Sequence, residues 1–466
     1  MAKQISRRDF IKMAGVMFGG ATLAACTAPA TPTTAPSSEE EVKTGGPALK
    51  NVKLTFAYYA AEGFDDNLYG EFLKKLQTGL KAKFPTLDFE PIQADYQKQA
   101  MAMAAGNAAD VSVINVPAAW PLMYRRQLAN LTEAMSADDE WKEYMTHFVK
   151  STIDAYTYQN ALWAVPFSVE TTGTVYNEDL LKAVGVKLPH EYSDTEWDWD
   201  AFVSTAAKVV KGEGQDKVWG AAMSAEWQSG LGDLVVSNGG NLLSDDGLSA
   251  RVTEDAFVEA AQRCVDTVLK DQVAPSSGAL SNSQLNTYSA FINQKVAFMV
   301  SGDWAFGWVL NNQLPDAKFK LNFYTSPVSP KTKKVAGIGH STGFYTWAGS
   351  KNLPEALAFA KFLASKEGQL PISENWTKSP ILSPRTDCQE PFWSLNLVPN
   401  PDAMKRAFEV AVPYPHTPLM SASVAIGHVN TALTLMMDGT ETRTVKEVLA
   451  EVNDKINKDL AKGAQG

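Results

Sequence analysis

Cysteine, histidine and long apolar stretches are all scarce in this chain of 466 residues. It contains three cysteines and five histidines, and none of them form a group with the spacing of a metal site. After residue 26, no apolar stretch approaches the roughly 20 residues that a membrane-spanning helix needs. The sequence therefore predicts no bound metal, no resident cofactor and no membrane-spanning helix after residue 26.

The chain also lacks a surplus of positive charge. It has 42 basic and 52 acidic residues, which gives a net charge of −10. Nucleic-acid binding depends on clustered lysine and arginine, so this balance argues against a nucleic-acid partner. A hydrophobic content of 45% with 20% charged residues is ordinary for a folded protein, and the length suits two or three domains.

Two sorting signals occupy the start of the chain. The stretch Ser6–Lys12 contains an arginine pair and is typical of a twin-arginine export signal, which is read by a translocase for folded proteins. The apolar stretch 13–25 is too short to span a membrane. It ends in Leu-Ala-Ala-Cys, the pattern of a lipoprotein box, which would place a lipid on Cys26. The sequence thus predicts a signal peptide over 1–25 and an exported protein anchored by lipid to the outer face of the cytoplasmic membrane, at the cell surface or in the periplasm.

The residues after Cys26 divide into a stalk and a folded part. Residues 26–49 are rich in Thr, Ala, Pro and Ser, a composition typical of a flexible stalk. Beyond them, short apolar strands alternate with amphipathic helices, which favours a layered α/β fold with mostly parallel strands. The expected strands are 52–59, 87–92, 110–116, 165–175, 218–223, 296–300, 320–324 and 344–349. The expected helices are 72–84, 100–105, 200–211, 254–270, 354–365, 404–410 and 445–460.

The two cysteines beyond the stalk leave one question open. Cys264 stands among apolar residues at helical spacing, which predicts a core residue. A disulfide between Cys264 and Cys388 is permitted in an exported protein, but the sequence does not fix the distance between them. A disulfide and two free thiols therefore both stay open.

Seven short segments form an ordered pattern along nearly the whole folded part. They are Gly106–Val111, Leu128–Thr132, Leu162–Phe167, Val175–Leu181, Trp197–Phe202, Val296–Met299 with Gly302–Ala305, and Ser350–Asn352 with Ala356–Phe362 and Ser365–Glu367. Each segment alone is a weak indication, but all seven in this order resemble the family 1 extracellular solute-binding proteins of ABC transporters.

This resemblance implies a fold of two α/β lobes joined by a hinge that the chain crosses three times. The crossings would fall near 168–172, 325–328 and 374–380. The N-terminal lobe would comprise residues 50–168 and 328–374, and the C-terminal lobe residues 172–325 and 380–466. Ligand would bind in the cleft between the lobes, which close around it by hinge motion.

The resemblance also implies a function without catalysis. The expected role is the substrate-binding component of an ABC importer, which captures a sugar or oligosaccharide outside the membrane and delivers it to the permease subunits. No catalytic residue is expected, and the protein is expected to act as a monomer.

Candidate ligand-binding residues follow from the chemistry of sugars. A sugar site needs flat aromatic rings for the apolar ring faces and carboxylates or amides for the hydroxyls. Trp304 follows a strand and a Gly-Asp turn, at the strand end where α/β folds bind ligands, and the resemblance implies a ligand-stacking role for it. The resemblance likewise implies that Glu170 contacts sugar. Further candidates for ligand contact, which could equally be core or surface positions, are Tyr59, Asp66, Trp120, Trp227, Trp376 and Ser341. Trp197 and Trp199 are expected to be structural residues that pack at the start of a helix.

Two other functions remain as alternatives. Gly339–Gly343 fits G-x-S-x-G, the nucleophile elbow of α/β-hydrolases, and acidic residues followed by histidines come later in the required order, Asp387 or Asp402 and then His416 or His428. An exported esterase is therefore one alternative, although the segment 344–349 is expected to be a strand where the elbow requires a helix. A binding protein for a non-sugar ligand such as a polyamine is the other, although the twelve tryptophans favour carbohydrate.

Overall fold

The computed structural model describes residues 49–59, 66–306, 309, 318–375, 381–394 and 400–465, with backbone only at 66–69, 215 and 375. The predicted signal peptide, Cys26 and the stalk up to residue 48 lie outside the described residues, as does Trp376. From Leu49 onward the chain forms one compact unit. No helix in these described ranges combines the length and the apolar character that crossing a membrane requires.

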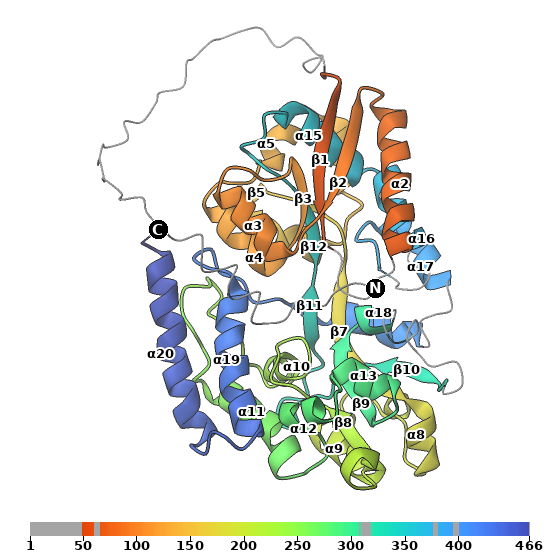
Figure 1. Cartoon of the computed structure of the whole chain (residues 1–466), viewed down its shortest axis with the longest axis vertical. Coiled ribbons are helices and arrows are strands. Elements are labelled where there is room, and N and C mark those ends of the chain that lie inside the picture. Colours follow the sequence, from red (N-terminus) through yellow and green to blue (C-terminus); the bar gives the residue numbers. More distant parts are fainter. Residues whose placement is uncertain are drawn as a thin grey trace, which may run out of the picture. The chain divides into compact units, whose positions relative to one another are not determined.

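The first of two main sheets has five strands in the order β2-β1-β3-β12-β6. Strands β1, β2 and β3 are parallel and are joined by helical crossovers, whereas β12 runs antiparallel to both β3 and β6. Helices α2 and α16 lie side by side on this half of the molecule, as Figure 1 shows. The elements are β1 (Val52–Tyr58), α2 (Asp66–Lys83), β2 (Leu87–Gln93), α3 (Tyr96–Ala104), β3 (Val111–Asn115), β6 (Val165–Pro166), β12 (Thr342–Thr346), α15 (Leu353–Ala364) and α16 (Lys366–Asn375).

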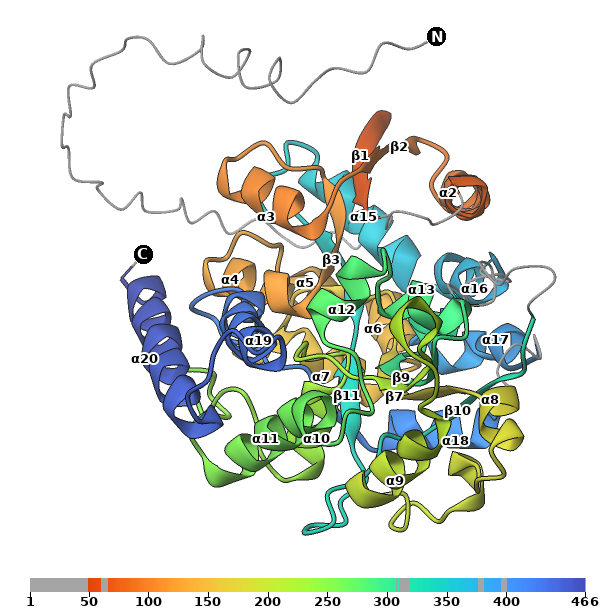
Figure 2. The same ribbon diagram turned by 60° about the horizontal axis from the view of Figure 1, so that its bottom comes forward.

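The second sheet has six strands in the order β13-β11-β7-β9-β8, and β10 also pairs with β7. Strand β7 is antiparallel to β9, β10 and β11. Helices α11, α19 and α20 pack against one another on this half of the molecule (Figure 2). The elements are β7 (Glu170–Asn177), α9 (Trp199–Val209), β8 (Trp219–Ala222), α10 (Leu231–Ser237), α11 (Asp255–Leu269), β9 (Val296–Gly302), β10 (Leu321–Tyr324), β11 (Gly337–His340), α18 (Pro401–Glu409), β13 (Ala411–Pro413), α19 (Ala422–Met437) and α20 (Val445–Gly463).

Shorter elements fill the connections. They are α4 (Val116–Tyr124), α5 (Leu131–Met135), α6 (Asp139–Met145), α7 (Lys150–Ala155), the hairpin β4 (Thr157–Tyr158) and β5 (Ala161–Leu162), α8 (Glu178–Ala183), α12 (Ser277–Asn282), α13 (Thr287–Ile292), α17 (Glu390–Ser394) and the 3-10 turns Pro189–Glu191, Gly214–Asp216 and Thr386–Cys388. The alternation of strands and helices confirms the predicted α/β fold.

The chain passes between the two sheets three times, and two of these passages lie beside each other, whereas the third leads from β12 through helices α15 to α18 to β13. Residues 167–169 connect β6 to β7, and the single residue Ser341 connects β11 to β12. The expected continuous strand 165–175 is therefore wrong, because Phe167 packs in the first core and Val169 in the second. Sheet membership assigns 337–340 to the second sheet. It does not locate a hinge, so the proposed lobe boundaries and crossings stay predictions.

Each sheet has its own hydrophobic core. Phe89 and Phe359 stack at 5.1 Å in the first, and Trp197 lies fully buried in the second, together with Trp199 as expected.

Cys264 is a core residue of the second half, which confirms that prediction. Cys264 and Cys388 are both free and buried, and burial raises the pKa of each thiol to about 12.

Strand β8 and helix α9 approach each other too closely for a side chain at Gly220. A Cβ atom at this position would overlap the backbone carbonyl of Ala206, which cannot move without the rest of its helix. We expect Gly220→Ala to lower the free energy of unfolding by roughly 1–3 kcal/mol, measured by urea denaturation.

Gly427 in α19 provides the matched control, because a Cβ there would meet nothing within 4 Å. Gly427→Ala should raise the free energy of unfolding by up to about 1 kcal/mol, since alanine is the better helix former. Equal effects of the two substitutions would contradict the close contact between β8 and α9.

Candidate functional site

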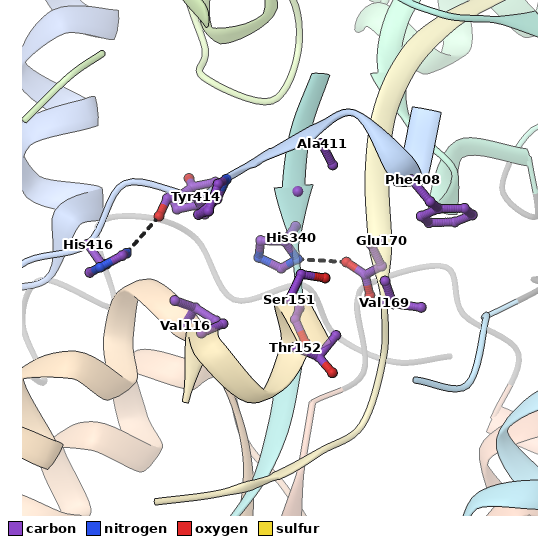
Figure 3. A pocket seen from close by; sticks show the side chains of 14 residues that line it. Val116, Ser151, Thr152, Val169, Glu170, His340, Phe408, Ala411, Tyr414 and His416 are labelled. Atoms are coloured by element: carbon purple, nitrogen blue, oxygen red, sulfur yellow. Dashed lines mark hydrogen bonds and ion pairs between the residues drawn. The ribbon is translucent and has the colours of Figure 1, made fainter. Parts of the chain in front are cut away.

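A pocket opens where the adjoining ends of β7 and β11 meet the segment 411–416, with α4 and α7 on the opposite side (Figure 3). Its walls therefore come from both halves of the molecule. The cavity volume is about 60 Å³, which is space for a few water molecules. The lining residues are Val116, Ser151, Thr152 and Ala155 from the first half, Val169, Glu170, Gly339, His340 and Ser341 from the paired strands, and Phe408, Ala411, Pro413, Tyr414 and His416.

A hydrogen-bonded histidine and glutamate lie on the strand side of the pocket. The register of β7 and β11 places His340 directly opposite Glu170, and residues opposite each other in an antiparallel pair share one face of the sheet. The Nδ1 atom of His340 lies 2.6 Å from a carboxylate oxygen of Glu170, and the two side chains are only 11% and 14% exposed. Burial opposes ionisation of Glu170, but the facing imidazole outweighs it and holds the pKa of this carboxyl below its ordinary value.

A second carboxyl, that of Asp303, lies behind this pair. The amide of Asp303 donates to the carbonyl of Thr171, and the amide of Thr171 donates to Oδ1 of Asp303, both at 3.0 Å. Burial, and then the negative charge of Glu170, raise the pKa of Asp303 well above its ordinary value. The surroundings therefore favour the protonated form of Asp303 and the charged form of Glu170.

Burial keeps the other titratable neighbours uncharged. It raises the pKa of Tyr414 and of Tyr156 and lowers the pKa of His416. Among the lining residues that the structure describes, Glu170 is therefore the group in which a partner outweighs the effect of burial on the pKa.

Aromatic rings surround His340 and His416. The ring of Trp304 meets His340 edge-on at a centroid distance of 6.0 Å, and Tyr414 does so at 5.4 Å. The Trp304 indole packs over Gly302, and its N–H donates to the hydroxyl of Tyr288 at 3.1 Å. On the other side, Trp120 stacks on His416 at 3.9 Å. This stack joins α4 of the first half to the segment 411–416 of the second.

Four of the residues predicted from the sequence lie at or beside this pocket. Glu170 and Ser341 line it, Trp304 contacts it through His340, and Trp120 contacts it through His416. The Ser341 hydroxyl donates to the carbonyl of Ser168 and accepts from the hydroxyl of Tyr156, so it holds the strands together at the passage between sheets.

The other predicted ligand-binding residues fall into two groups. Two of them lie away from the pocket, and for the other two the structure does not describe the side chain. Trp227 is 2% exposed and stacks on Phe257 in the second core. Tyr59 stacks on Tyr96 at 4.5 Å, beyond the end of β1. Asp66 begins α2 but is one of the residues whose side chains the structure does not describe, and Trp376 lies outside the described residues.

The sequence reasoning missed His340, Tyr414 and the hydroxyls of Ser151 and Thr152 as lining residues. His340 was noticed only as part of the pattern Gly339–Gly343. Because side chains alternate along a strand, His340 and Ser341 are expected to point to opposite faces. No local sequence pattern, however, indicates that His340 pairs with Glu170, which lies 170 residues earlier.

The hydrolase alternative finds no support at this site. Strand β12 follows Ser341 directly, where a nucleophile elbow requires a helix. The Ser341 hydroxyl is bonded to Ser168 and Tyr156, and Nδ1 of the neighbouring His340 is bonded to Glu170. No group of three or more His, Cys, Asp or Glu side chains within the described ranges is placed to hold a metal ion.

Comparison with known proteins extends these observations. A family model described as a bacterial extracellular solute-binding protein matches residues 73–419. The multiple sugar-binding protein of Streptococcus mutans is 20% identical over 231 residues, which are 48% of this chain and 52% of that protein. The chain thus matches about half the length of this curated relative.

Solved structures share the fold. The ABC substrate-binding protein Lmo0181 from Listeria monocytogenes, in complex with cycloalternan, superposes with a TM-score of 0.73 at 21% identity, over 88% of this chain and 99% of that one. Maltose-bound MalE3 of T. maritima gives a TM-score of 0.67 at 20% identity, over 87% and 98%. At these identities the likeness concerns the fold, and it confirms the predicted two-lobe architecture.

The pair of His340 and Glu170 makes a testable contribution to stability. His340→Ala leaves a buried carboxylate without its partner, so we expect a loss of roughly 2–4 kcal/mol in the free energy of unfolding at pH 7. Adding Glu170→Gln should restore part of that loss.

The stability that the lowered pKa of Glu170 provides exists above its unfolded pKa of about 4.3 and is lost as pH falls through the folded value. The deficit of the variant should therefore shrink at pH 4, measured by urea denaturation.

His428 serves as the control, because its Nε2 faces Asp459 at 2.9 Å in a more exposed setting. His428→Ala should cost less than about 1 kcal/mol. If His428→Ala lowered the free energy of unfolding as much as His340→Ala does, the deeper burial of the pair at the pocket would not explain the cost of breaking it.

Proposed function

This chain belongs to the bacterial extracellular solute-binding proteins, and from that premise we propose that it is the substrate-binding component of an ABC importer for a sugar or oligosaccharide. The observation that carries the proposal is the pocket shared by the two halves, with α4 and α7 on one side and β7, β11 and the segment 411–416 on the other. A site divided in this way couples ligand binding to the separation of the halves.

The chemistry of the walls supports a sugar as the ligand. The aromatic rings of Phe408 and Tyr414 line the pocket and offer surfaces for the apolar faces of a sugar ring, and the ring of Trp304 lies beside His340. Hydroxyls of Ser151 and Thr152, together with the Glu170 and His340 pair, offer hydrogen bonds to sugar hydroxyls. The proteins named above are described as sugar-binding or as bound to cycloalternan and maltose, and we extend this ligand class to the present chain.

Ligand entry requires the walls to separate. A cavity of about 60 Å³ holds a few water molecules, so a sugar enters only when the halves move apart. The two adjacent passages between the sheets, 167–169 and Ser341, are where such a rotation would be absorbed. In the proposed mechanism the halves then close around the sugar, and the permease recognises the closed form.

The N-terminal signals complete the proposal. The family implies an exported protein. We infer that export follows the twin-arginine route and that a lipid on Cys26 tethers the protein to the outer face of the cytoplasmic membrane. The protein acts as a monomer and catalyses no reaction of its own.

Thermal unfolding with a panel of ligands tests this function. We expect a neutral sugar or oligosaccharide at about 100 times its dissociation constant to add roughly 2.7 kcal/mol of stability, which appears as a higher melting temperature. Trp304→Ala should weaken that sugar at least tenfold, because it removes the ring beside His340.

The control for this experiment is Trp219→Ala, since Trp219 lies half-buried in β8 beneath Lys217 and away from the pocket. Trp219→Ala should bind the sugar as the native protein does. A melting shift with a polyamine and none with any sugar would refute the carbohydrate proposal.

The anchor has its own test. Cys26→Ser removes the thiol that would carry the lipid, so we expect the protein to move from the membrane fraction to the soluble exported fraction. Cys388→Ser should leave the distribution unchanged, because Cys388 is a buried thiol of the folded part. Retention of Cys26→Ser at the membrane would exclude lipidation at this residue.

A further inference from the structure

His340 offers a polar atom at the pocket that its pairing with Glu170 does not use. Its Nδ1 is bonded to Glu170, and within the part of the chain that the structure describes its Nε2 has no hydrogen-bond partner. Figure 3 shows the ring in the middle of the labelled side chains, with Glu170 on one side and Val116, Tyr414 and His416 on the other. Because the two ring nitrogens lie on different sides of the ring, the bond to Glu170 turns Nε2 away from that carboxylate.

The ring has little freedom to turn. Trp304 and Tyr414 both meet it edge-on, at interplanar angles of 64° and 74°. The strand pairing fixes its backbone opposite Glu170. A donor and an acceptor held in this way form a directed hydrogen bond at low entropic cost.

Resting on the function proposed above, we propose that Nε2 of His340 binds a hydroxyl group of an uncharged sugar directly, and that Glu170 is a positioning residue that orients the ring. An imidazole suits this task in either protonation state. With Nδ1 held by the carboxylate, Nε2 accepts a hydroxyl proton in the neutral ring and donates its own proton in the charged ring.

The charges around the ring favour an uncharged ligand. The titratable groups that face the pair are Asp303 after β9, Tyr156 after α7, and Tyr414 and His416 in the segment 411–416. Burial shifts the pKa of each of these groups in the direction that disfavours its charged form. The carboxylate of Glu170 is already matched by His340, so the ammonium groups of a polyamine would find no unpaired acid there.

Two substitutions of His340 distinguish the roles of its two ring nitrogens. The amide of asparagine occupies the place of Nδ1, so His340→Asn keeps a partner for Glu170 and loses the group at Nε2. The longer glutamine reaches the place of Nε2. With maltose, maltotriose and cycloalternan as calorimetric probes, we expect His340→Asn to raise Kd at least tenfold and His340→Gln to raise it less.

Glu170→Gln tests the positioning role. We expect it to raise Kd only a few-fold, and to raise Kd no further when His340→Asn is already present, because Glu170 acts through the imidazole ring. His428→Asn, remote from the pocket, should leave Kd unchanged. Urea denaturation of each variant verifies that the fold is retained.

The outcomes distinguish the two proposals. Normal binding by His340→Asn, or a Glu170→Gln variant that is as weak as His340→Asn and whose effect adds to it in the double variant, overturns this inference and leaves the sugar-binding function standing. If the native protein binds none of the three sugars while a polyamine raises its melting temperature, both proposals fall.

Discussion

The pairing of β7 with β11 is the interaction on which the site depends. These two strands belong to the second sheet, and each leaves it within a few residues to join the first. Their register brings Glu170 and His340 together at the point of departure. Without it, the carboxylate would be buried alone, which costs several kcal/mol, and the two halves would lose their adjacent connections.

Burial then decides which groups at the site carry charge. Burial disfavours ionisation of three carboxyl and phenol groups near the pair, those of Asp303, Tyr156 and Tyr414, because the surrounding protein solvates their charged forms poorly. Glu170 remains ionised because it alone among them faces an imidazole at 2.6 Å. The hydrogen-bonded pair of Glu170 and His340 in an otherwise aromatic wall is the feature on which the proposed recognition of sugar hydroxyls rests.

Much of the fold could be predicted from the sequence, because strands and helices have different hydrophobic periods and the seven segments keep their order. The expected helix 254–270 corresponds to α11 at Asp255–Leu269, and the expected strand 296–300 begins β9 at Val296. The failure at 165–175 has a clear cause. Alternation cannot show that Phe167 and Val169 enter different cores. The resemblance to the solute-binding family led to Glu170, which lines the pocket, and, together with its place after a strand, to Trp304, which contacts His340. The site was not predictable at His340, whose role comes from pairing with a distant strand, nor at Trp227, whose burial depends on helix α11.

The one-residue connection at Ser341 limits how the chain can change over evolutionary time. Residues on both sides of it are paired in different sheets, so its length is specified twice, once by Gly339 opposite Thr171 and once by Gly343 opposite Ile114. Inserting a single residue would reverse the faces of one strand relative to the other and direct Phe344, a buried residue, away from its core. Insertions and deletions should therefore be excluded from this connection, while the exposed loops at the outer ends of both sheets remain free to vary in length.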